Sequence, residues 1–305
     1  MRSYVARRLL YAAFVLVGVS VVVFFLVRLS GDPAALMMPL DATDEDVARL
    51  RTALGFDRPW PVQYADFFVR ALQGDFGTSI RHQQPAMGMV LARLPATLQL
   101  MAMALGVALA IALPLGILSA LYPNSLVDRF GVVMALVGQA IPNFFLGIVL
   151  ILFFSVHLQW LPSSGRGGVE HLVLPAITLG TASAAFINRL LRSSLREVLA
   201  TDYVRTALAK GRSRRDVVLH HALRNAAIPV LTVVGIQVVQ LVGGAIVTET
   251  VFAYPGAGLL LVQSLGTRDV PVIQAFVMMI AVVVTIVNFA VDLLYGAIDP
   301  RISLA

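Results

Sequence analysis

The sequence predicts an all-α integral membrane protein with six transmembrane helices. Hydrophobic residues make up 58% of the 305 residues and charged residues only 13%, whereas soluble domains average about 25% charged residues. Six uncharged runs of 17 to 27 residues match the roughly 20 apolar residues that a spanning helix needs. Because the runs are continuous rather than short and alternating, they indicate helices and not a β-barrel. The runs are Leu9–Val27, Ala96–Leu121, Phe130–Val156, Leu172–Asn188, Asn225–Thr248 and Val270–Val291.

The first run resembles a signal peptide in one respect, because Arg2, Arg7 and Arg8 precede it. Its 19 residues exceed the roughly 7 to 15 of a typical signal-peptide core. No small-residue cleavage pattern follows it in Arg28–Pro33. We therefore expect an uncleaved membrane anchor.

The charges of the connecting segments predict the orientation. The segment 189–224 has nine basic and three acidic residues, and 30–95 has six arginines and eight acids. Basic residues accumulate on the cytoplasmic side. We therefore expect the N-terminus, 189–224 and the C-terminus in the cytoplasm, and 30–95 outside. The net charge of +6 is then explained by arginines at the membrane, and no nucleic-acid partner is expected.

The outer segment 30–95 is expected to be helical rather than a plain linker. Thr43 and Asp46 have capping-box spacing, and Gly55 suits the end of the helix that they begin. Pro61 suits the first position of a second helix, which Gly74–Gly77 would end. A lid over the span ends is favoured over a docking surface, and both interpretations stay open.

The inner segment 189–224 predicts a helix, a short helix, a sharp turn and another helix. Arg189, Arg192 and Arg196 are spaced for one helical face at the lipid headgroups. Thr201 or Asp202 can cap a short helix over 203–210, and Gly211 tolerates the positive φ of its end. Ser213 would begin the next helix, running to Arg224. From the pattern alone, a lipid-facing basic loop and a plug for a partner's groove are equally compatible.

The sequence carries little catalytic chemistry. It lacks cysteine and the motifs GxxxxGK[ST], HExxH and GxSxG, and we expect no enzyme activity, metal or cofactor in this chain. Among the ionisable groups near span ends, Glu249 and Asp292 are interpreted as solvated. Pro114, Pro142 and Pro175 are candidate kinks. Candidates for a pathway or outer gate are Gln139, Asn143, Gln237, Gln240, Glu249, Phe252 and Asn288.

The inner segment resembles the cytoplasmic loop of bacterial ABC-importer permeases, of the dipeptide, oligopeptide and nickel type (the B-type subunit). The resemblance rests on Glu197–Leu199 and His221–Pro229, and between them on Asp202, Tyr203, Val204, Arg205, Thr206, Ala207, Leu208, Ala209, Lys210 and Gly211. Arg205 stands where the general importer motif has Glu. Further matching segments are Gly31–Pro33, Leu54–Pro59, Gly74–Gly77, Thr248–Gly258, Arg268–Pro271 and Val291–Arg301.

The resemblance implies one permease domain over 1–305, with type I importer architecture. Segment 189–224 would be the coupling loop, and residues 202–211 would fit a groove on an ATPase subunit. The partners would be a second permease, two ATP-binding subunits that hold ATP and Mg, and an extracytoplasmic binding protein. The chain would lie in the bilayer of the bacterial inner membrane and form half of a pathway for di- and oligopeptides.

Several alternatives stay open. Nickel chelates and glutathione are further candidate substrates of the same machinery, because specificity rests largely with the binding protein. An ion-coupled secondary carrier is the alternative from another class. It predicts inverted repeats and buried acids, and the sequence shows neither.

Overall fold

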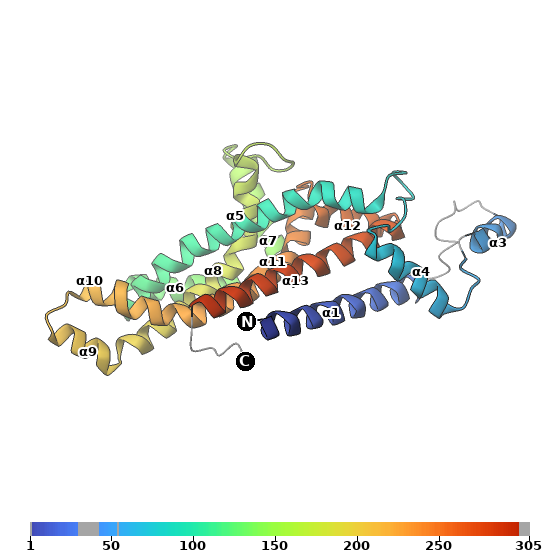
Figure 1. Ribbon diagram of the computed structural model, residues 1–305. Coiled ribbons are helices and arrows are strands. Elements are labelled where there is room, and N and C mark those ends of the chain that lie inside the picture. Colours follow the sequence, from blue (N-terminus) through green and yellow to red (C-terminus); the bar gives the residue numbers. More distant parts are fainter. Residues whose placement is uncertain (1, 30–42, 54, 299–305) are drawn as a thin grey trace. The chain divides into compact units, whose positions relative to one another are not determined.

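The computed structural model describes residues 2–29, 43–53 and 55–298, which are mostly helical (Figure 1). The expected similarities at Gly31–Pro33 and Asp299–Arg301 lie outside these residues. Thr78 and Pro85 form an isolated β-bridge. The helices are α1 (Arg2–Leu29), α3 (Asp44–Ala53), α4 (Trp60–Leu72), α5 (Ala86–Leu121), α6 (Leu126–Ala140), α7 (Asn143–Leu150), η1 (Ile151–His157), α8 (Glu170–Leu199), α9 (Asp202–Ala209), α10 (Arg214–Asp216), η2 (Val217–Ala222), α11 (Leu223–Val251), α12 (Ala257–Gly266) and α13 (Val270–Ile298).

The expected helical membrane protein is confirmed. Five helices of the described residues are long and apolar enough to cross a bilayer, and a bent pair makes up to six. The five are Ala6–Leu29, Ala86–Leu121, Glu170–Leu199, Val217–Val251 and Val270–Val291. Most of them extend beyond the uncharged runs, since helix geometry continues where side chains become polar.

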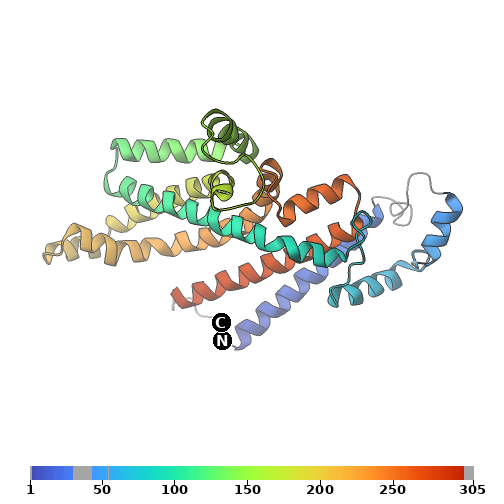
Figure 2. The same ribbon diagram turned by 90° about the horizontal axis from the view of Figure 1, so that it is seen from above.

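The third expected span is not one continuous helix. It consists of α6 and of α7 with η1, and the two parts are bent by 106° (Figure 2). Proline lacks an N–H group and pushes the preceding residue out of the helical region. Accordingly Ile141 has ψ of 122° and Pro142 ψ of 138°. Pro114 and Pro175, by contrast, lie inside the uninterrupted helices α5 and α8.

Among the described residues, two segments of helix are wound as π-helix, η1 and η2. The second corrects the expected end of a helix at Arg224. From Arg214 the chain runs through α10 and η2 into α11, and α11 contains Pro229. The expected cytoplasmic helix and the fifth span are therefore one continuous helical segment.

The chain forms two compact units. The first comprises the described residues up to 96 and residues 255–286, and therefore contains α1, α3, α4 and α12. In it α4 packs on α1, where the Ser20 and Tyr64 hydroxyls lie 2.8 Å apart and Phe24 contacts the Tyr64 and Phe67 rings. The buried Asp269 accepts a hydrogen bond from the Ser79 hydroxyl at 2.5 Å, fixing the loop before α5 to that before α13.

Local signals in the described part of the segment 30–95 are largely as expected. The Thr43 hydroxyl and the Asp46 backbone N–H form the capping box at 3.3 Å, and Gly55 has φ of +70°. Helix α4 begins at Trp60, so Pro61 occupies the second helical position rather than the first. Gly74, after the helix, has φ of +75°.

The second unit comprises, of the described residues, 97–254 and 287–298, and α8 is its central helix. Helices α6, α7 and α11 all pack on α8. Its core includes Ile187 and Leu191 with Ala112 and Val230, and nearer α9 Leu195 with Ala222 and Ala226. Gly180 permits a close approach to α5, since an added Cβ would lie 2.5 Å from the Ala104 carbonyl oxygen.

Candidate coupling helix and pathway residues

Helix α9 begins at Asp202, one residue before the expected start, and follows α8 after Ala200 and Thr201. The expected side-chain cap is wrong. The Thr201 hydroxyl donates to the Val198 carbonyl oxygen at 2.6 Å, and no side chain caps the helix. That bond holds the turn between α8 and α9. Asp202 lies in the first turn of α9, where a negative charge is favourable.

The end of α9 is a Schellman motif, a helix terminus closed by two backbone hydrogen bonds. Gly211 N–H donates to the Leu208 carbonyl oxygen at 3.0 Å, and Arg212 N–H donates to that of Ala207 at 3.4 Å. Gly211 has φ of +84°, a conformation that glycine adopts without steric cost. The expected role of Gly211 as the helix terminator is confirmed.

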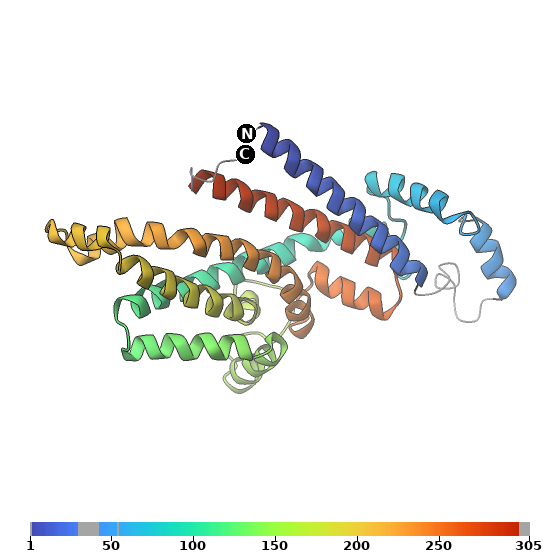
Figure 3. The same ribbon diagram turned by 90° about the horizontal axis from the view of Figure 1, so that it is seen from below.

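One face of α9 is fixed to the protein and the rest is exposed. Val204 is buried, and the Tyr203 hydroxyl accepts a hydrogen bond from Asn225 Nδ2 of α11 at 2.8 Å. The exposed residues include Leu208, Arg205 and Lys210, so an apolar side chain lies among basic ones. Helix α9 lies beyond the ends of α8 and α11 (Figures 1 and 3). It is thus a small, anchored projection with a mixed surface.

The turn after α9 carries a second set of local contacts. Asp216 N–H donates to the Ser213 hydroxyl at 3.2 Å, as the capping pattern predicts. The Asp216 carboxylate accepts from Arg212 at 2.7 Å and contacts His220 Nδ1 at 2.9 Å. The hydrogen bond from Arg212 lowers the pKa of Asp216 below its ordinary value. The carboxylate is therefore ionised at neutral pH and helps to hold the turn.

Glu249 is fully buried, which corrects the expectation that it is solvated. Its Oε1 accepts a hydrogen bond from the Thr97 hydroxyl at 2.6 Å, and Thr97 is also buried. A buried carboxylate needs such donors to offset its lost hydration. The side chain of Asp292, the other acid in question, lies outside the described set.

The other pathway candidates differ in their burial and in their contacts within the second unit. Phe252 is buried at the end of α11, and its carbonyl oxygen accepts from Gly165 N–H at 3.0 Å. Gln237 accepts from the Ser183 hydroxyl at 2.9 Å, between α11 and α8. Asn143 begins α7 at the helix break. Gln139, Gln240 and Asn288 are exposed. The seven candidates therefore differ in burial and in their contacts, and their role in a pathway stays a prediction.

Sequence reasoning missed an ion pair between α6 and α8, in which Asp128 is buried and Arg192 is partly exposed. Arg192 Nε and Nη2 donate to the two carboxylate oxygens of Asp128 at 2.5 and 2.9 Å. We expected Arg192 to face the lipid headgroups, but its guanidinium instead binds the Asp128 carboxylate. Ser125 caps α6 by accepting from Asp128 N–H. The Ser-x-x-Asp pattern at 125–128 could have revealed the helix start, although not the partner of Asp128.

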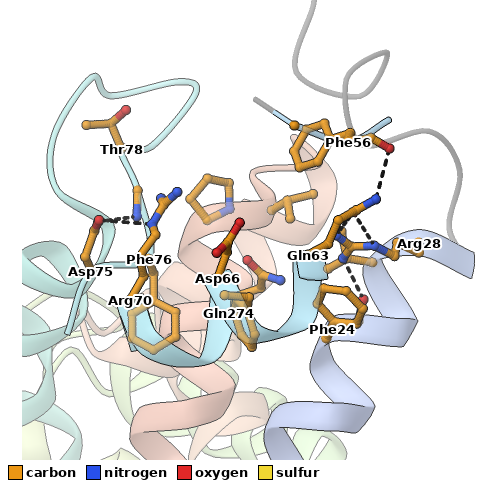
Figure 4. A pocket seen from close by; sticks show the side chains of 16 residues that line it. Phe24, Arg28, Phe56, Gln63, Asp66, Arg70, Asp75, Phe76, Thr78 and Gln274 are labelled. Atoms are coloured by element: carbon orange, nitrogen blue, oxygen red, sulfur yellow. Dashed lines mark hydrogen bonds and ion pairs between the residues drawn. The ribbon is translucent and has the colours of Figure 1, made fainter. Parts of the chain in front are cut away.

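A cavity of about 280 Å³ lies in the first unit, among the end of α1, α4 and the start of α13 (Figure 4). Its wall is ordered by internal contacts. The Arg28 guanidinium lies 3.4 Å from the Phe24 ring centroid and donates to Gln63 Oε1 at 3.1 Å. Arg70 pairs with Asp75 at 3.2 Å. In the described parts of the chain, no group of three His, Asp or Glu residues could hold a metal ion.

The structure is thus a helical membrane unit in which a short helix, ended by a Schellman motif, lies between two long helices. Comparison with protein families gives a match over most of the chain. Residues 112–304 match the family described as binding-protein-dependent transport system inner membrane component, and residues 1–101 match its N-terminal companion. The chain belongs to this family. It is a multi-pass membrane permease of a transport system.

Relatives of this permease align over nearly its whole length. The glutathione transport system permease protein GsiC of Salmonella typhimurium is 44% identical over 303 residues, covering 99% of each chain. The oligopeptide transport system permease protein AppB of Bacillus subtilis is 40% identical, covering 99% of this chain and all of the relative. The dipeptide transport system permease protein DppB of Alkalihalophilus pseudofirmus is 39% identical with the same coverage.

Solved structures support the fold. The inward-facing MetNI methionine ABC transporter superposes with a TM-score of 0.59 at 22% identity, over 70% of this permease and 97% of that chain. A second crystal form of the same transporter gives 0.57 at 21% identity. The expected type I importer architecture is therefore confirmed for the fold.

Proposed function

We propose that this permease forms half of the membrane pathway of an ATP-driven importer, through which di- and oligopeptides enter the cell. Its relatives are named as peptide, dipeptide and glutathione permeases and align over 99% of the chain. The N-terminus, α9 and the C-terminus would face the cytoplasm, and the segment 30–95 the outside, as the charge asymmetry of the loops favours. The membrane is the bacterial inner membrane.

The observation that carries the proposal is the construction of α9. A short helix transmits force only if both ends are fixed, and α9 is closed by the Schellman motif at Gly211 and anchored by Val204 and Tyr203. Its exposed Leu208, Arg205 and Lys210 suit a groove with apolar and acidic groups. In this mechanism residues 202–211 occupy such a groove on an ATPase subunit. Closure of the ATPases then moves α9 and opens the pathway outward.

The proposal requires several partners. A second permease subunit supplies the other half of the pathway, and two ATP-binding subunits hold ATP and Mg. An extracytoplasmic binding protein delivers the peptide, facing the outer segment and the loop 249–271. This chain is non-catalytic in the complex. Glu249 and Phe252 contribute to the outer gate, which their burial near the end of α11 supports.

Glutathione is a specific second candidate for the substrate. The relatives named as glutathione permeases are 43 to 44% identical, above the peptide and dipeptide permeases at 38 to 40%. Glutathione is itself a small peptide, so the two candidates share the chemistry of a backbone with charged ends.

The test begins with purification of the full chain, tagged at its C-terminus, from membranes in mild detergent. Mass spectrometry should identify a second permease and P-loop ATPase subunits. Recovery of the chain alone, or as a homo-oligomer, under every mild condition would contradict the importer. The purified complex is then reconstituted in liposomes together with its binding protein. ATP is supplied either inside or outside the liposomes, so that the ATP-binding subunits of both orientations are tested.

Uptake measurements in these liposomes separate the remaining alternatives. A labelled dipeptide, a labelled oligopeptide, glutathione and a nickel chelate are compared at equal concentration. ATP-dependent uptake of the peptides supports the main proposal, and uptake of glutathione alone supports the second candidate. Uptake that needs an ion gradient but no ATP would indicate a secondary carrier instead.

A further inference from the structure

The ion pair between α6 and α8 has the geometry of a rigid link. The Asp128 side chain is only 4% exposed and that of Arg192 24%. Two parallel N–H to carboxylate bonds fix direction as well as distance. Asp128 Oδ2 also accepts from Asn124 N–H at 2.9 Å, so the turn between α5 and α6 is part of the same arrangement.

A second bond lies one turn away on the same face of α8. Asn188 Nδ2 donates to the Gly131 carbonyl oxygen of α6 at 3.0 Å. On α6 the buried residues are Asp128, Gly131, Ala135 and Gly138, a spacing of three and four that forms one helical face. Most other large side chains of α6 are exposed. Helix α6 is therefore held to α8 by a narrow strip, and its only buried charge in that strip is Asp128.

The link lies between α9 and the helix break. Arg192 is followed by seven residues of α8, then by Ala200, Thr201 and α9. In the other direction, Asp128 is in the first turn of α6, and α6 ends at the break before Asn143. A movement of α9 along α8 would thus reach α6 through the ion pair, and through α6 the bent α7.

We propose that Asp128 and Arg192 are positioning residues that pass the movement of α9 to α6 and α7. The inference rests on the proposed function, because it assumes that ATPase subunits move α9. The pair stays closed while α8 and α6 move together. Without it, only the Asn188 hydrogen bond and the packing of small residues still join α8 to α6. Less of the movement then reaches α6, so less substrate is imported for each ATP hydrolysed.

The test uses the complete complex in liposomes and compares Asp128→Asn and Arg192→Gln with the matched control Arg189→Gln. Arg189 lies on the same helix, is exposed, and contacts the Phe186 ring, so its loss removes an equal charge and leaves the pair intact. Measured quantities are complex yield, thermal midpoint, ATP hydrolysis and substrate imported per ATP. We expect the two pair variants to lose about tenfold in substrate per ATP, within the roughly 5- to 150-fold range of coupling between sites.

A restraint experiment separates positioning from simple stabilisation. The chain has no cysteine, so Asp128→Cys with Arg192→Cys introduces the only two thiols of this subunit. Bridging them with a short bifunctional thiol reagent should restore substrate imported per ATP, while the unbridged variant stays uncoupled. The thermal midpoint of both samples is recorded alongside.

The outcomes are distinguishable. Wild-type liposomes without ATP-driven uptake would overturn the proposed function itself. A working wild type, with pair variants that keep the wild-type ratio of substrate to ATP, would overturn the link. The link would also be overturned if uptake and ATP hydrolysis of the pair variants fell together, in proportion to the loss of folded complex. A bridged variant with a restored thermal midpoint, but still with low import of substrate per ATP, would overturn it as well.

Discussion

Replacement of Gly211 by valine tests whether the turn that ends α9 is needed for transport. Gly211 has φ of +84°, and nothing lies within 4 Å of an added Cβ, so the cost is one of backbone conformation and not of space. The left-handed conformation costs an L-residue roughly 1–2 kcal/mol. A free energy of this size changes, by a factor of about 5 to 30, the ratio of molecules in which the two hydrogen bonds of the Schellman motif are formed to those in which they are broken. We expect a corresponding loss of ATP-driven uptake, with hydrolysis by the ATPase subunits persisting.

The measurement is uptake and ATP hydrolysis by the reconstituted complex, at equal amounts of each variant. Gly74→Val is a matched control, since Gly74 has φ of +75° and also has open space around it, but lies in the outer segment. Gly211→Asn should retain most of the uptake, because asparagine tolerates this conformation. Normal uptake by Gly211→Val at normal complex yield would refute the role of the turn.

Three further substitutions test separate contacts. Tyr203→Phe removes the hydrogen bond from Asn225, worth about 0.5–1.5 kcal/mol. It should reduce uptake severalfold without affecting the yield of the complex. An unchanged amount of substrate imported per ATP would show that transport does not need this hydrogen bond. Thr97→Val removes a hydrogen-bond donor from buried Glu249 and should lower stability by about 1–3 kcal/mol, whereas Thr97→Ser should not, as thermal unfolding of the two complexes will show. Gly180→Ala forces a methyl group against a carbonyl oxygen of α5 and should destabilise the subunit by about 1–3 kcal/mol. The destabilisation should appear as a lower thermal midpoint of unfolding. A midpoint equal to that of the wild type would mean that α8 and α5 can move apart without a loss of stability.

The helical membrane fold could be predicted from the sequence because the signal is contained in each run of residues. A bilayer imposes a minimum length and an apolar composition on every span, and both are visible without knowledge of neighbours. The third span shows where this ends. Its composition is continuous from Phe130 to Val156, yet the chain turns by 106° after Ala140. Proline indicates a disturbance of the helix, but its size depends on the packing of α7 against α8 and α11.

The same distinction separates the parts of the site. The end of α9 could be predicted because glycine conformation and helix capping are local, and both lie within a few residues of Gly211. The Arg192–Asp128 pair joins residues 64 positions apart, and no local pattern identifies either as the other's partner. The burial of Glu249 likewise depends on Thr97, 152 positions away.

Helix α9 is connected to the rest of the second unit by two routes, and their chemistry predicts which one carries more of its movement. The route to α11 includes the single neutral hydrogen bond between Tyr203 and Asn225, which is exposed. The route through α8 ends in two part-buried, charge-assisted bonds from Arg192 to Asp128, and such bonds are about twice as strong as neutral ones. Asp128→Asn should therefore uncouple hydrolysis from uptake more than Tyr203→Phe does. If Tyr203→Phe had the larger effect, the movement of α9 would pass mainly into α11. The ion pair between α8 and α6 would then not be the contact that carries this movement.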